Sequence, residues 1–183
     1  MARSDAVRNR EKVLRAAEAV LGEQGLSARM DEIARRAGVG VGTVYRHFAT
    51  KEALYQAIVT ARVDELLAEA AQLRDSGEPR TAFFTFFTRV VVDAAGKKAY
   101  IDALRTAGID PKAGQAGQAA EMRKAIDDLL REAQQAGAVR PDAALPEILA
   151  LLRGASMAAE TGDYPAGVLD RSLAFLLDGL RPA

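Results

Sequence analysis

Cysteine is absent from this sequence of 183 residues, and histidine occurs only once, at His47. Without cysteine the chain can form no disulfide and offers no thiolate ligand to a metal. One histidine leaves no credible ligand set for a metal site, and no cofactor is expected. General-base or nucleophilic catalysis needs a positioned His, Cys or activated Ser, so the sequence does not indicate an enzyme.

Long apolar runs are missing as well, and no secretory leader is expected. No stretch reaches the ~18 apolar residues that a membrane-spanning helix needs. Residues 1–5 are polar and lack the apolar segment of a signal peptide. We therefore expect a cytoplasmic protein with no membrane partner.

An excess of charge of one sign is also missing, because 25 Lys and Arg balance 25 Asp and Glu. The distribution is nevertheless uneven, since residues 1–50 hold nine Arg and Lys against six acidic residues. Phosphate binding depends on the local field at the contact surface, so a basic end on a neutral chain is compatible with nucleic acid. The excess is small, and it does not by itself establish DNA binding.

Strand-like alternation is lacking, whereas helical periodicity runs through almost the whole chain. The predicted fold is all-α with about nine helices. It comprises an N-terminal three-helix domain at 1–50 and a C-terminal helical domain at 51–183. Asn9 is expected to cap the first helix and Thr50 the fourth. The later helices are expected at about 51–74, 80–95, 98–106, 117–136, 145–161 and 165–180.

The segment from residue 30 to residue 48 is the most informative part of the sequence. Its periodicity predicts two short amphipathic helices joined only by residues 38–40. So short a link favours a steep crossing angle, which is helix-turn-helix geometry. Val44 and Phe48 should face inward and hold the second helix to the domain.

The opposite side of that second helix has an unusual composition for a purely structural surface. Gly42 costs ~1 kcal/mol relative to alanine in a helix, which makes sense if another backbone must come close. Facing DNA, the first amides of the helix would point their positive end at a phosphate. Val41 and the Thr43 methyl group would touch thymine methyls, and Arg46 would read guanine or clamp a phosphate.

The run from Gly25 to Leu54 resembles the DNA-binding region of the TetR family of regulators. The resemblance is carried by Ile33-Ala34, Ala37-Gly38-Val39, Gly42-Thr43, Tyr45, Phe48, Lys51-Glu52 and Leu54. It covers about residues 10–55, while the remainder matches only in length, helicity and helix count. The resemblance implies a homodimer that binds a near-palindromic site on double-stranded DNA. It also implies release by an unknown small-molecule effector, with repression as the usual output.

Carried over by position in this motif, the resemblance implies DNA contacts at Arg29, Val41, Gly42, Thr43, Tyr45, Arg46, His47 and Lys51. Four of these match phosphate-contacting positions: Thr43, Tyr45, His47 and Lys51. Val41, Gly42 and Arg46 match base-contacting positions, and the ring of Tyr45 is also expected to pack against the domain.

Two residues depart from the family pattern. Gly40 replaces the usual Ser or Thr cap of the recognition helix, and Arg29 replaces the usual Thr or Ser before the second helix. Each loses a side-chain cap worth ~1 kcal/mol, less where glycine substitutes. Arg29 is expected to reach the DNA backbone instead.

Four of the six phenylalanines cluster in the fifth helix, at Phe83, Phe84, Phe86 and Phe87. Core packing explains them, and so does the lining of an apolar ligand cavity. The cavity interpretation selects Phe83, Phe87, Tyr100, Leu104, Met122 and Ile126. Tyr100, Arg123 and Asp127 are the candidates for its few polar groups.

The last two helices carry apolar residues over an arc wider than the ~100° of a surface helix, which indicates burial on two sides. A two-fold four-helix interface between two copies would cover both sides. The expected interface residues are Leu152, Ala155, Ala159, Leu169, Leu173, Leu176 and Leu180. The alternative is that these are interior helices of a monomer.

One further function stays open at this point. A helical small-molecule-binding protein without specific operator recognition would share the same core, and the missing caps and zero net charge allow it. Binding to a palindromic site against random duplex separates the two functions.

Overall fold

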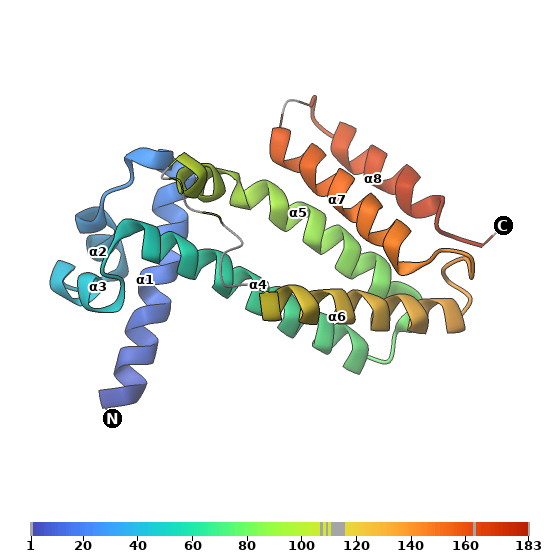
Figure 1. Ribbon diagram of the computed structural model, residues 1–183, viewed down its shortest axis with the longest axis horizontal. Helices are drawn as coiled ribbons and strands as arrows, with labels where there is room; N and C mark the ends of the chain where they lie inside the picture. Colours follow the sequence, from blue (N-terminus) through green and yellow to red (C-terminus); the bar gives the residue numbers. More distant parts are fainter. Residues whose placement is uncertain (1, 107, 109, 111–115, 163, 183) are drawn as a thin grey trace. The chain divides into compact units, whose positions relative to one another are not determined.

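The structure, a computed structural model, describes residues 2–106, 108, 110, 116–162 and 164–182. All regular elements in this part of the chain are helical, which confirms the all-α prediction (Figure 1). They are α1 (Ala2–Gln24), the short 3₁₀ turn η1 (Gly25–Ser27), α2 (Met30–Ala37), α3 (Val41–His47), α4 (Lys51–Asp75), α5 (Pro79–Thr106), α6 (Ala116–Gln135), α7 (Leu145–Thr161) and α8 (Val168–Asp178). No helix in the described ranges is long and apolar enough to cross a membrane.

The chain divides into two compact units. The first unit comprises residues 1–62 and 97–114, and the second comprises residues 63–96 and 115–183. The domain boundary expected between residues 50 and 51 falls inside the first unit. The reason is that α4 and α5 are long helices, and each of them contributes residues to both units.

Two expected helix boundaries are wrong. The break at Gly96 does not occur, because α5 runs without interruption from Pro79 to Thr106. One glycine costs ~1 kcal/mol in a helix interior, which the alanines and lysines around it and the packing of the helix outweigh. The first helix begins at Ala2 instead of after Asn9, because the residues before Asn9 include good helix formers such as alanine and arginine.

The core of the first unit is built from the faces that the periodicity predicts. α1 buries Val13, Ala17 and Val20, and all three are fully inaccessible. They pack with buried residues of the next three helices, Ile33, Val44, Leu54 and Ile58, and with Phe48, which directly follows α3. Burial of apolar surface stabilises by roughly 25 cal/mol per Å². The short helix α3 is therefore fixed to α1, α2 and the start of α4 by its inward side chains.

The core of the second unit gathers the phenylalanine cluster. Phe83, Phe84, Phe86 and Phe87 are all buried, which confirms the core interpretation for them. The ring centroids of Phe83 and Phe84 lie 5.5 Å apart in an edge-to-face arrangement, which favours aromatic pairs. Buried residues of α6, α7 and α8 complete this core, and α7 and α8 lie side by side (Figure 1).

Candidate nucleic-acid interface

The link between α2 and α3 is a tight turn set by one glycine. Gly38 ends α2 in the left-handed region, with φ +68°, which other residues rarely adopt. The Val39 amide donates to the Ala34 carbonyl at 3.0 Å and closes the end of the helix. After Gly40 the chain re-enters a helix, so the two helices are separated by residues 38–40, as predicted.

Neither α2 nor α3 has a side-chain cap at its N-terminus. Arg29 and Gly40 occupy the two cap positions, and neither makes a capping hydrogen bond through its side chain. This confirms the loss of caps inferred from the sequence. At Gly40 the Thr43 amide donates to the backbone carbonyl at 2.8 Å, which begins the helix. The other early amides of α3 lack a capping side chain. Uncapped amides at a helix N-terminus can donate to an anion instead.

The side of α3 away from the core is open to solvent. Val44 is fully buried, whereas Val41 and Tyr45 are 45% and 50% exposed. Arg46 is exposed too, and an added Cβ at Gly42 would meet no atom within 4 Å. The expected packing of Tyr45 thus covers only half of its side chain. The exposed side combines a glycine, two apolar side chains and a guanidinium group.

Six of the eight residues expected at DNA lie at the exposed or half-buried surface of α3. Val41, Gly42, Tyr45 and Arg46 are exposed, and Thr43 and His47 are half-buried. The structure therefore brings the six residues of this helix together on one short rod, and Lys51 begins the next helix, α4.

The start of α4 is well ordered by local interactions. Thr50 caps it as predicted, because its Oγ1 accepts a hydrogen bond from the Ala53 amide at 3.1 Å. The ammonium group of Lys51 lies over the Tyr55 ring, 5.6 Å from its centroid. A lysine at a helix N-terminus opposes the helix dipole, and the cation–π contact offsets part of that cost. The cation and the helix end together favour an anion here.

The guanidinium group of Arg29, which is expected to reach the DNA backbone, already has a partner within the chain. Its Nε and Nη2 donate to the two carboxylate oxygens of Asp31 at 3.1 and 3.0 Å. Both side chains are well exposed, so this pair is weak and exchangeable. A phosphate contact by Arg29 requires this pair to open.

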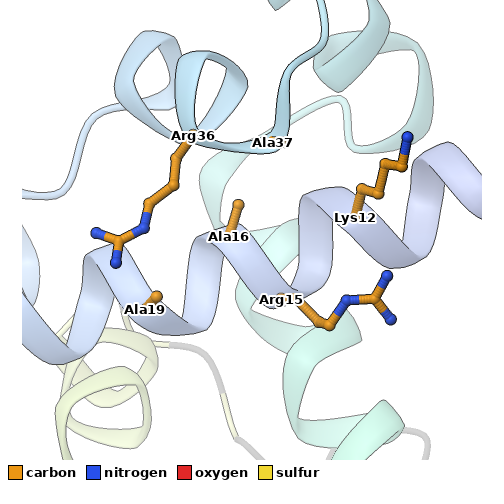
Figure 2. Close-up of a pocket in the computed structure, with 6 residues that line it drawn as sticks. All are labelled: Lys12, Arg15, Ala16, Ala19, Arg36 and Ala37. Atoms are coloured by element: carbon orange, nitrogen blue, oxygen red, sulfur yellow. The ribbon is translucent and has the colours of Figure 1, made fainter.

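A basic groove that the sequence analysis did not single out lies between α1 and α2 (Figure 2). Its volume is about 370 Å³, and its cations are Lys12, Arg15 and Arg36. Figure 2 shows Arg36 toward one end, Lys12 and Arg15 toward the other, and alanines between them. Arg36 is paired with Glu23 at 2.6 Å, and because both side chains are exposed this pair is weak as well. The signal in the sequence was the basic excess of residues 1–50.

Tyr55 beneath Lys51 is a buried phenol. It is 3% exposed, and its hydroxyl has no hydrogen-bond partner among the described residues. Burial, and to a smaller degree the charge of Glu52, raises the pKa of Tyr55 to about 12. The neutral phenol is thus favoured in the folded chain.

Replacing Tyr55 by phenylalanine tests this assignment through the pH dependence of stability. At neutral pH we expect Tyr55→Phe to leave the free energy of unfolding unchanged or slightly higher, because an unpaired hydroxyl is removed. As pH rises above about 10, the unfolded phenol ionises first and the wild type loses stability up to about pH 12. The variant should lack this loss in denaturant titrations at pH 7 and pH 11. Parallel losses in both proteins would contradict the assignment.

The residues expected to line one ligand cavity do not all lie at the same place in the structure. Met122 and Ile126 line a groove of the second unit with a volume of about 560 Å³, and so does Arg123. Phe83 and Phe87 lie in the core and do not line this groove. Leu104 belongs to the core of the first unit. The side chain of Tyr100 lies outside the described residues, and Asp127 is paired with Arg131.

The residues expected at a dimer interface face the protomer's own core. Leu152, Ala159, Leu173 and Leu180 are buried within the second unit, and the other three are half-buried: Ala155, Leu169 and Leu176. On the outward sides of α7 and α8 other apolar side chains are exposed: Leu151 (37%), Met157 (60%) and Phe175 (75%). Helical spacing could have separated the two sides, because Phe175 lies two positions from the buried Leu173.

Comparison with known protein families finds a match for the N-terminal part of the chain and another for the C-terminal part. Residues 13–58 match the family described as bacterial regulatory proteins, tetR family. Residues 78–182 match the family described as transcriptional regulator SbtR-like, C-terminal domain.

Two solved structures are similar over nearly the whole chain. The TetR transcription regulatory protein from Mycobacterium vanbaalenii is 38% identical, covers 100% of both chains and superposes with a TM-score of 0.84. A TetR transcriptional regulator from Streptomyces coelicolor is 35% identical over 95% of this chain and 99% of its own, with a TM-score of 0.79. An HTH-type transcriptional regulator of Staphylococcus aureus (strain MRSA252) is 45% identical over 69 residues, which are 37% of this chain. The match spans only 36% of that relative's length.

Proposed function

Because the chain belongs to the TetR family of transcriptional regulators, we propose that it binds a palindromic DNA operator as a homodimer and is released by a small-molecule effector. The family consists of regulators of transcription and not of enzymes. The observation that carries the proposal is the exposed side of α3, where Gly42 leaves open space beside Val41 and Arg46.

DNA contact is assigned to α3 and the start of α4. In the major groove Val41 meets thymine methyls, Gly42 permits close approach, and Arg46 reads a guanine or holds a phosphate. Thr43, Tyr45, His47 and Lys51 take phosphates on either side, and Arg29 joins them if it leaves Asp31. Arg46 forms no hydrogen bond or ion pair with another described residue, which supports its availability.

Dimerisation is assigned to the outward sides of α7 and α8. Exposed Met157 and Phe175 provide an apolar surface there, and Gly154 allows a close approach of α7. A two-fold axis would bury this surface against its own copy in a four-helix arrangement. The inward residues named from the sequence then support the interface from behind and do not contact the partner.

Effector binding is assigned to the second unit, and α4 is the element that can transmit it. This continuous helix of 25 residues carries Lys51 in the first unit and continues into the second from residue 63. A ligand that prefers a conformer with the wrong separation of the two α3 helices lowers DNA affinity. DNA lowers ligand affinity by the same factor, typically through ~1–3 kcal/mol of coupling.

Two alanine variants distinguish phosphate contacts from base contacts. Lys51→Ala should weaken binding similarly on all sequences and reduce the salt dependence by ~1 in log–log slope per half-site, because a phosphate contact is lost. Arg46→Ala should change the preferred base instead, with a loss of ~1–3 kcal/mol on the wild-type site. Fluorescence anisotropy on site variants at several salt concentrations measures both effects.

Lys124→Ala is the matched control for these variants, because Lys124 is an exposed lysine of the second unit. It should leave affinity and salt slope unchanged. A uniform loss in Arg46→Ala would make Arg46 a backbone contact. Equal affinity of the wild type for random duplex and for any selected site would favour a ligand-binding protein without operator recognition.

A further inference from the structure

The groove of about 560 Å³ in the second unit has a distinctive lining. It lies among α5, α6 and α7, and its walls include Val90, Met122, Ile126, Leu149 and Leu152. Its volume lies within the ~300–1,000 Å³ typical of small-molecule sites, which are largely apolar with a few placed polar groups. The polar side chains that line it are Arg123, Arg153 and Ser156. No acidic residue is among the described residues that form it.

The two arginines differ from most others in this unit. Arg74, Arg89 and Arg131 each form an ion pair with an aspartate or glutamate at 2.8–2.9 Å. Neither Arg123 nor Arg153 forms an ion pair or hydrogen bond with another described residue. Two guanidinium groups at one apolar groove therefore keep their donors available for an anion.

A second hollow beside the first has the same cationic border. Its lining shares Arg123, Leu149 and Arg153 with the groove and adds Gly154 and Met157, which belong to the surface assigned to dimerisation. The two arginines thus lie at the boundary between the groove and that surface. Asp93 of α5 is a buried carboxylate three residues after Val90, which lines the groove. It lines neither hollow and already has an interaction partner.

We propose that this groove binds an amphipathic anion, with its apolar chain along α5 and α6 and its carboxylate or phosphate head held by Arg123 and Arg153. The inference rests on the proposed function, since it names the chemical class of the effector. Arginine suits such a head because its planar donors match carboxylate and phosphate oxygens. The apolar walls gain from burying a hydrocarbon chain.

Four probes with the same alkyl chain test the charge preference on the full-length protein. Laurate, lauryl phosphate, lauryl alcohol and laurylamine are titrated calorimetrically below their micelle-forming concentrations. We expect the two anions to bind at least about tenfold more tightly than the alcohol, and the amine to bind most weakly. Laurate against lauryl phosphate then distinguishes a carboxylate head from a phosphate head. Equal binding of amine and anions, or no binding of either anion, overturns the proposal.

Substitution of the two arginines tests whether laurate binds at this groove. The double variant Arg123→Ala/Arg153→Ala should lose about tenfold or more in laurate affinity and leave the alcohol unaffected. Arg131→Ala is the matched control, since Arg131 is an exposed arginine of the same helix α6 and lines neither hollow. Full laurate affinity in the double variant overturns the proposal.

A groove-filling variant tests the apolar part and the competing occupant. Ala120 is exposed and lines the groove, so Ala120→Trp should fold, as circular dichroism can verify, and should lose all chain-dependent binding. Ala119→Trp, at a neighbouring exposed lining position, provides a second test if the first variant misfolds. If a second copy of the chain occupies the groove instead, Ala120→Trp becomes monomeric in sedimentation and the wild type binds no laurate.

The failure of this inference is distinguishable from failure of the proposed function. Specific DNA binding is measured separately, without any lipid. A protein that binds a palindromic site but no anion retains the proposed function and loses only the effector class. A protein that binds laurate through Arg123 and Arg153 but no specific DNA site retains the anion-binding groove and loses the proposed function.

Discussion

Gly42→Leu is expected to abolish specific DNA binding while leaving the fold at least as stable as the wild type. A Cβ added at this position would meet no atom from outside its own stretch of helix within 4 Å, and α3 is helical there. Leucine is favoured over glycine in a helix by about 0.5–1 kcal/mol, so the free energy of unfolding should rise. The same side chain would stand between α3 and the groove of the DNA. Operator affinity should then fall to that for random duplex, a loss of about 10³-fold.

Gly22→Leu is the matched control for this experiment. Gly22 is also an exposed helical glycine with open space around its Cα, but it lies in α1. It should gain similar stability and keep full DNA affinity. Thermal unfolding and fluorescence anisotropy on the selected operator measure the two properties. Wild-type operator affinity in Gly42→Leu would mean that this side of α3 does not face DNA.

Phe175→Glu is expected to convert the proposed dimer to a monomer and to weaken operator binding by about 10²–10⁴-fold. Phe175 is 75% exposed in the protomer, so the protomer itself should tolerate a charge there. In an apolar two-fold interface the same charge would be buried without a partner, once on each side. In a dimer, binding of one α3 helix to its half-site places the second α3 helix at a high effective concentration near the other half-site. A monomer lacks this effect and therefore binds the operator more weakly.

Val92→Glu serves as the control, because Val92 is an exposed apolar residue (51%) on α5, outside α7 and α8. It adds the same charge and should remain dimeric with unchanged DNA affinity. Sedimentation velocity gives the assembly state and anisotropy gives the affinity. A dimeric Phe175→Glu protein with intact operator binding would remove α7 and α8 from the interface.

The helix-turn-helix was predictable from the sequence because its determinants are local. A glycine that must adopt positive φ at position 38, a three-residue link and inward Val44 and Phe48 leave few arrangements for α2 and α3. The exposure of Val41, Gly42 and Arg46 follows from the same helical spacing. Thr50 was recognised as a cap for an equally local reason, its hydroxyl next to the first amides of α4.

Features that depend on which residues lie close in space were harder to predict than features set by local sequence. Gly96 indicated a helix end, but packing of α5 along its length outweighs the cost of one glycine. In α7 and α8 the pattern indicated two apolar sides without telling which side faces the protomer's own core. The availability of Arg123 and Arg153 depends on which acids lie beside them in space, and the sequence does not state this.

Selection of bound fragments from random-sequence DNA by the purified protein tests the central claim most directly. A dimer that reads DNA through α3 should enrich a palindrome whose half-sites are centred about one helical turn apart, ~34–36 Å. It should bind that site at least ~10³-fold more tightly than random duplex at physiological salt. Enrichment of no motif, or of a single site without two-fold symmetry, would contradict the claim.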